Sequence, residues 1–142
     1  MGHQASLAQS FLQRIGPVNA SHLSYVSINF PVVEGLRDVQ SHGEHSALEK
    51  DDFLSLQLLL DKCTNLMTLE MRLYGENAKV LNKTSQNAAG AQLIREAFAQ
   101  IDTQRKGIRS LSSFVVRVYN GLPAPEVVEY MKRLGWAVLP GH

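Results

Sequence analysis

The chain has 142 residues, of which 44% are hydrophobic and 19% are charged. This composition is typical of one globular domain, excludes a disordered chain, and contains no apolar run near the ~20 residues that span a bilayer. The net charge of +1 does not demand a nucleic-acid partner, and the single cysteine, Cys63, excludes an internal disulfide. Because the N-terminus lacks the pattern of a secretory signal, we expect a reducing, cytoplasmic location.

The first residues, MGHQAS, match the N-myristoylation pattern at Gly2. One acyl chain binds a membrane only marginally, and no polybasic segment follows to assist it. An ordinary start of the chain is therefore favoured over a lipid anchor.

A first helix is predicted over residues 5–15 and ends at Gly16-Pro17. Its apolar face consists of Leu7, Phe11, Leu12 and Ile15. Residues 23–30 are ambiguous, because Val26, Ile28 and Phe30 alternate as in a strand but no partner strand is evident. A short helix or an extended loop is favoured there.

Residues 40–47 predict a polar loop that contains the only cluster of histidine and carboxylate side chains, His42, Glu44 and His45. Residues 42–44, His-Gly-Glu, match half of a zinc-deaminase motif, but the Pro-Cys-x-x-Cys half is absent. A solvated loop is favoured, and no metal is expected.

A long central helix is predicted over about residues 48–81, which contain no proline and only one glycine. Apolar residues recur at alternating spacings of three and four, as in helix-on-helix packing. This stripe comprises Phe53, Leu56, Leu60, Cys63, Met67, Met71, Tyr74, Ala78 and Leu81. A second apolar face comprises Leu54, Leu58, Leu59, Leu66, Leu69 and Leu73. Such a helix is the centre of a bundle or is shared with another chain, and Cys63 is then an inert core residue.

The C-terminal third predicts a helix over residues 91–101 and another over 124–135. The second has Pro125 in its first turn and Gly135 at its C-terminal cap, so Trp136 is expected to fold back onto the core. Residues 111–121 are predicted as a helix ending at Gly121, with a strand over 114–118 as the alternative.

Residues 95–114 resemble the outline of the EF-hand family, with Asp102 at the first loop position and Gly107 at the sixth. The ligands disagree, because Gln104, Lys106 and Ser113 stand where oxygen ligands belong. We therefore interpret this segment as the end of a helix followed by a basic turn.

Residues 118–136 have the rhythm of a helix-turn-helix, which suggests nucleic-acid binding. Glu126 and Glu129 oppose this interpretation, because they would repel phosphates at the start of the second helix. The side chains that would contact phosphate are Arg105, Lys106, Arg109, Arg117, Lys132 and Arg133.

Together these features predict a single all-α domain over residues 1–142. The domain is expected to have five or six helices built around the long helix near 48–81, with room for one short extended segment near residues 23–30 or 114–118. No catalytic, cofactor or metal site is expected, so the predicted function is a non-enzymatic helical interaction, assembly or adaptor protein that binds a protein partner or itself. The alternative is a nucleic-acid-binding regulator that uses residues 105–135, and a weaker third is an enzyme whose active residues are scattered along the chain.

Overall fold

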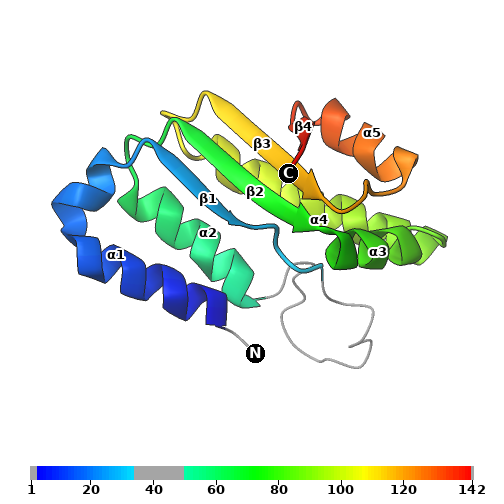
Figure 1. Cartoon of the computed structure of the whole chain (residues 1–142), viewed down its shortest axis with the longest axis horizontal. Coiled ribbons are helices and arrows are strands. Elements are labelled where there is room, and N and C mark those ends of the chain that lie inside the picture. Colours follow the sequence, from blue (N-terminus) through cyan, green and yellow to red (C-terminus); the bar gives the residue numbers. More distant parts are fainter. Residues whose placement is uncertain (1–2, 34–49, 142) are drawn as a thin grey trace.

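The computed structural model describes residues 3–33 and 50–141, which form a parallel β-sheet covered by helices (Figure 1). The strand order is β1-β2-β3-β4, with every neighbouring pair parallel. The strands are β1 (Tyr25–Asn29), β2 (Thr68–Tyr74), β3 (Ser113–Tyr119) and β4 (Ala137–Pro140). The helices are α1 (His3–His22), α2 (Lys50–Lys62), α3 (Gly75–Thr84), α4 (Ala88–Lys106) and α5 (Pro125–Arg133). The predicted all-α bundle is therefore wrong, and the fold class is mixed α/β.

The strands follow one another across the sheet in chain order, without a reversal. Crossovers between parallel strands are almost always right-handed, so an unreversed order places the connecting helices on the same side. Figure 1 shows this arrangement, with β1, β2 and β3 in front and α2 and α4 behind them. Parallel sheets are ordinarily covered on both faces. Here no described helix lies over the near face of these three strands, which we call the open face.

The covered face of the sheet forms the core. Its central row is fully buried, since Leu69, Met71 and Leu73 of β2 are each 0% exposed. They lie in register beside Phe114, Val116 and Val118 of β3. The helices pack onto these rows with buried side chains that include Leu56, Leu59, Leu81, Ile94, Ala97, Phe98, Ile101, Val127 and Met131.

The predicted long helix over 48–81 is wrong because the chain turns after α2 and enters the sheet as β2. The residues of β2, TLEMRLY, include good helix formers and only one β-branched residue, so their intrinsic preference gave no warning. Pairing with β1 and β3 overrides that preference, as strand formation depends on neighbours more than on propensity. The turn contains neither glycine nor proline, and buried Cys63 and Leu66 hold it to the core.

The two ambiguous segments are both strands. Residues 114–118 belong to β3, so the strand alternative is confirmed and the helix is wrong. For residues 23–30 the favoured short helix or loop is wrong, because residues 25–29 form β1. Its partner, β2, was hidden within the predicted long helix.

Three predicted helix boundaries are confirmed. Gly16 adopts φ 83° and interrupts α1 before Pro17, after which one further helical turn follows. Helix α5 begins at Pro125 and ends with Gly135 at φ 87°. Two hydrogen bonds form a Schellman motif there, from Gly135 N to Lys132 O and from Trp136 N to Met131 O. Trp136 is 3% exposed, as expected for a residue folded onto the core.

The first turn of α4 packs directly against the end of α3. Asn87 caps α4 by accepting a hydrogen bond from Gly90 N at 2.7 Å. A Cβ at Gly90 would collide with the backbone carbonyl of Thr84, so only glycine permits this approach.

Alanine is ordinarily better than glycine in a helix by about 1 kcal/mol. We expect Gly90→Ala instead to lower the free energy of unfolding by about 1–3 kcal/mol in urea titrations, because overpacking displaces the α3–α4 connection. The control is Ala89→Gly at the exposed neighbouring position, which should cost no more than about 1 kcal/mol. A Gly90→Ala protein as stable as the wild type would contradict the close approach.

Candidate interaction face of the sheet

The open face is formed by the residues that alternate with the buried rows. Its members in the four strands are Tyr25, Ser27, Asn29, Thr68, Glu70, Arg72, Tyr74, Ser113, Val115, Arg117, Tyr119, Ala137 and Leu139. Strand geometry sends successive side chains to opposite faces, which separates these residues from the apolar core. The set contains three tyrosines, two arginines and one carboxylate but no lysine or histidine.

Glu70 is the polar centre of the open face. It is 7% exposed, since side chains from both neighbouring strands surround its carboxylate. Arg117 Nε donates to Glu70 Oε1 at 2.9 Å, and Ser27 Oγ donates to Glu70 Oε2 at 3.0 Å. Arg117 Nη1 also donates to the carbonyl of Pro140 at 3.2 Å, so this one arginine connects β2, β3 and β4.

The protonation state of Glu70 follows from these contacts. Burial by itself raises the pKa of this carboxyl, but hydrogen bonds from Arg117, Ser27 and Tyr25 outweigh it and hold the pKa below the ordinary 4.5. The pKa of Tyr25 is raised, first by burial and then by its hydrogen bond to the Glu70 carboxylate. Glu70 is therefore ionised near neutral pH, and its charge is matched by Arg117.

Arg72 lies beside Arg117 on the open face and is not satisfied in the same way. The two residues are paired in the β2–β3 register, and like charges at directly opposite positions repel each other. No side-chain hydrogen bond or ion pair of Arg72 forms within residues 3–33 and 50–141, and its Nε is buried without an acceptor. A buried donor without a partner costs about 1–3 kcal/mol. The Nε–H of Arg72, in the middle of the open face, is therefore a donor that the described residues leave without an acceptor.

Aromatic side chains flank the arginines. Tyr74 and Tyr119 follow them in register and stack with ring centroids 5.1 Å apart and planes at 20°. Tyr74 is 40% exposed, and a hollow of about 420 Å³ adjoins it where β2 and β3 end. That hollow is lined by Tyr74, Gly75, Glu76, Lys79 and Asn120. Tyrosine and arginine are the residue types that carry much of the binding energy in protein interfaces.

The structure separates Arg117 from the other five predicted phosphate-contacting residues, and the hydrogen bond from Arg105 to Leu134 brings the carboxyl ends of α4 and α5 together. Arg117 lies on the open face, whereas the other five belong to the carboxyl ends of α4 and α5 or to the turn after α4. Arg105 binds Asp102 and the carbonyl of Leu134, and Lys106 also binds Asp102. Arg109, Lys132 and Arg133 are exposed. The helix-turn-helix interpretation is wrong, because β3 stands where its first helix was expected.

Asp102 is a structural carboxylate in the last turn of α4 and not the start of a calcium loop. It accepts hydrogen bonds from Trp136 Nε1 at 2.9 Å and from Arg105 Nε at 2.7 Å, and Lys106 Nζ lies 3.0 Å away. Burial raises the pKa of Asp102, but these three partners outweigh burial and hold it below 3.8. The Asp102 carboxylate thus holds Trp136 and the last turn of α4 in place through these contacts.

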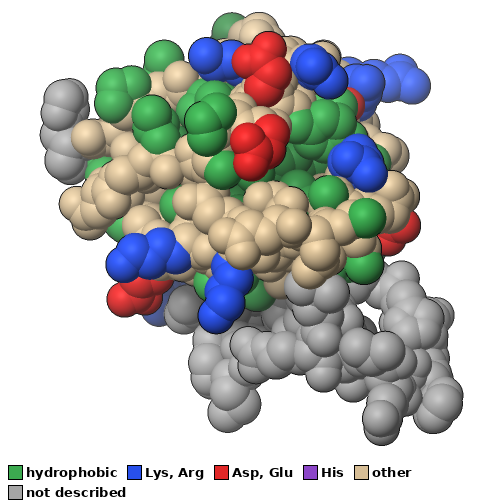
Figure 2. Space-filling model, turned by 90° about the vertical axis from the view of Figure 1, so that its right-hand side faces the viewer, with side chains coloured by type: hydrophobic (Ala, Val, Ile, Leu, Met, Phe, Trp, Pro, Cys, Tyr) green, Lys and Arg blue, Asp and Glu red, His purple; other side chains and the backbone are tan. Residues whose placement is uncertain are grey.

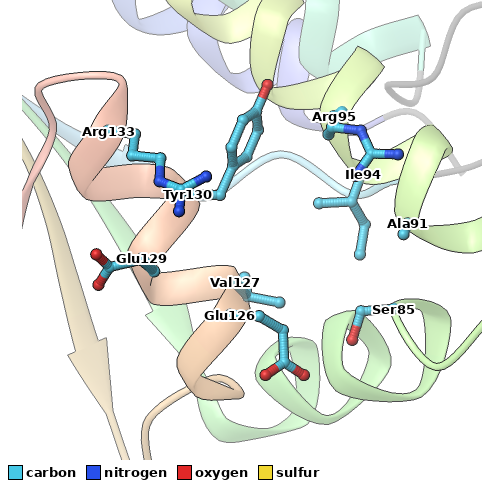
Figure 3. Close-up of a pocket in the computed structure, with 9 residues that line it drawn as sticks. All are labelled: Ser85, Ala91, Ile94, Arg95, Glu126, Val127, Glu129, Tyr130 and Arg133. Carbon is cyan, nitrogen blue, oxygen red and sulfur yellow. The ribbon is translucent and has the colours of Figure 1, made fainter.

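A second hollow, of about 310 Å³, lies between α4 and α5 (Figure 3). Its walls are Ser85, Ala91, Ile94, Arg95, Glu126, Val127, Glu129, Tyr130 and Arg133. Ser85 Oγ donates to the carbonyl of Asn82 at 2.9 Å, and no histidine lines the hollow beside it to act as a base. Figure 2 shows this end of the molecule, where hydrophobic side chains lie among both acidic and basic ones.

Metal binding has no support in the described part of the chain. No three histidine, cysteine, aspartate or glutamate side chains gather there around one point. His42, Glu44 and His45 lie outside the described residues, as does Gly2. Cys63 is 0% exposed, as predicted for a core residue, and burial raises the pKa of its thiol. None of the described helices has the length and apolarity needed to cross a bilayer.

Comparison of the chain with protein-family models, with curated proteins and with solved structures finds no significant match.

Sequence reasoning named Arg117 but not the other members of the open face. Tyr74 was assigned to a helical stripe, while Glu70 and Arg72 were not assigned to any site. The available signal was the alternation of Leu69, Met71 and Leu73 with Glu70 and Arg72, which is typical of a strand with one polar face. In β3 the same alternation is incomplete, because Val115 stands between Phe114 and Val116.

The ion pair between Glu70 and Arg117 makes stability depend on pH. We expect Glu70→Gln to lower the free energy of unfolding by about 1–3 kcal/mol at pH 7, because the amide leaves Arg117 poorly compensated. A carboxyl whose folded pKa is depressed stabilises the protein above its unfolded pKa and loses this effect as the pH falls through the folded value.

The difference between wild type and Glu70→Gln should therefore be constant from neutral pH down to about 5 and shrink below about 4.5. Urea unfolding at a series of pH values measures this difference in the free energy of unfolding. Asp102 is present in both proteins, so its contribution to the pH dependence cancels in the difference. A difference that stays the same down to pH 3 would show that the ionised Glu70 is not the stabilising species.

Proposed function

We propose that the chain is a non-enzymatic interaction module whose docking surface is the open face. The observation that carries this proposal is a parallel sheet with no helix of residues 3–33 and 50–141 over one face of β1, β2 and β3, and with three tyrosines and two arginines on that face. Tyrosine contributes large, rigid contact area with few rotatable bonds, which suits it to binding surfaces. These aromatic side chains add little to the stability of the fold while they are exposed to water, whereas a partner that covers them stabilises the folded state.

The topology supports binding rather than cofactor chemistry. In doubly wound α/β proteins, ligands bind where the strand order reverses. The order here, β1-β2-β3-β4, contains no reversal among the described strands and therefore no such crevice. Strand–helix units stacked in sequence are also the arrangement of solenoid proteins, which bind partners along an extended face. The resemblance to solenoid proteins is an analogy between folds.

Nucleic-acid binding by residues 105–135 is the competing function. Of its six basic residues, Arg105 and Lys106 pair with Asp102, and Arg117 pairs with Glu70. Nucleic-acid affinity grows with the number of phosphates neutralised, and acidic side chains accompany three of the six contacts. A protein partner on the open face is therefore favoured.

A photo-reactive amino acid placed at Tyr74 or at Leu139 tests the docking surface. Both residues are 40% exposed, and substitution of either leaves the buried rows intact. Irradiation in extract of the native host should give discrete protein adducts from these two positions. The matched control is Gln92, an exposed residue on the helix side of the molecule, which should give none of the same adducts.

Identical adducts from the open-face positions and from Gln92, or adducts from Gln92 alone, would contradict the proposal. Adducts that are removed by nuclease and resist protease would instead support the nucleic-acid function.

A further inference from the structure

Arg72 is the strongest indication of what the open face binds. Its side chain makes no hydrogen bond or ion pair within the described residues, and its Nε is a buried donor without an acceptor. Every other charged group on the face is matched, because Glu70 and Arg117 pair with each other. Buried donors in native proteins are almost always satisfied, so this unpaired Nε shows that the fold leaves the Arg72 guanidinium uncompensated in the middle of the open face.

The position of Arg72 defines the chemistry of that partner. It lies opposite Arg117 in the register between β2 and β3, so an anion placed over the pair relieves their mutual repulsion. The planar guanidinium matches a carboxylate through two parallel hydrogen bonds. Tyr74 and Tyr119 follow immediately on the same face, where their stacked rings offer apolar area beside the charge.

We propose that the open face binds an acidic segment of a partner protein. Arg72 binds an Asp or Glu carboxylate of that segment, and the partner residues next to this Asp or Glu pack against Tyr74 and Tyr119. This inference rests on the proposed function and adds the class of ligand to it. A single uncompensated arginine recognises one carboxylate. The face has no lysine, and Glu70 lies on it, so it does not offer the series of cations that a phosphate backbone requires.

The test is a selection of binders from a library of random short peptides on the full-length protein. Selected peptides should be enriched in Asp and Glu relative to the unselected library. A synthetic copy of a selected peptide should lose affinity by about 10-fold or more with Arg72→Gln, because a charge-assisted hydrogen bond is removed. Arg72→Lys should not restore the affinity, since a lysine lacks the planar fork.

The matched control is Arg109→Gln, which removes an exposed positive charge away from the open face and should leave the affinity unchanged. Arg72→Gln replaces a side chain that has no hydrogen-bonding partner among the residues the structure describes, so the unfolding midpoint of the variant should equal or exceed that of the wild type. The midpoint measurement ensures that a loss of binding is not a loss of folding.

Several results would overturn the inference: no binders, binders without acidic enrichment, or affinity that Arg72→Gln does not change. If peptides without acidic enrichment still lose affinity with Tyr74→Ala, the proposed docking face stands and the acidic ligand is wrong. If no open-face substitution affects binding, both are wrong. A single-stranded DNA oligonucleotide that binds through Arg72 while the peptides do not would assign the site to nucleic acid.

Discussion

The pairing of β2 with β3 is the constraint on which the rest of the structure depends. The two strands are paired over their full length, from Thr68 and Ser113 to Tyr74 and Tyr119. On one side this register buries the apolar rows against the helices, and on the other it aligns the arginines and the tyrosines. A shift of β2 by one residue would exchange its two rows of side chains, exposing Met71 and burying Arg72. The hydrophobic core and the candidate site are therefore fixed by the same register.

The charged residues of the open face differ in their hydrogen bonding, since Glu70 and Arg117 pair with each other and Arg72 does not take part in their network. Glu70 collects donors from β1 and β3, and through Arg117 it also reaches the carbonyl of Pro140 in β4. This network holds neighbouring strands together at a face where no described helix supports them. One row further along, Arg72 has no such partner among the described residues. Polar groups that stabilise the sheet thus lie beside an arginine that is not paired within this part of the chain.

The sequence predicted local boundaries well where specific residues impose them. Pro125 and Gly135 delimit α5 because each fits a particular backbone geometry, and the burial of Trp136 follows from that turn. The fold class was not predictable in the same way. The residues of β2 favour a helix on their own, and only the presence of β1 and β3 on either side makes them a strand. Once β2 was assigned to a helix, β1 had no partner and β3 was ambiguous, so one local error determined the predicted class.

The candidate site was predictable only in part, because its residues lie on different strands. Arg117 was recognised as a basic residue, but its charge was assigned to phosphate because its partner, Glu70, lies on another strand. The unsatisfied state of Arg72 is a property of its three-dimensional surroundings and has no local signature in the sequence. A site made from single residues on successive strands becomes visible only when the strand register is known.

The distribution of aromatic residues gives the molecule a natural set of chemical labels. Of its four tyrosines, Tyr25, Tyr74 and Tyr119 lie on the open face, and Tyr130 stacks on Phe98 beside the other hollow. The single tryptophan, Trp136, is buried among the rings of Phe30, Phe98 and Phe114. Reagents that modify accessible tyrosines therefore report mainly on whether the open face is covered, while Trp136 reports on the integrity of the interior. The two kinds of ring separate occupancy of the surface from folding of the core within one unmodified chain.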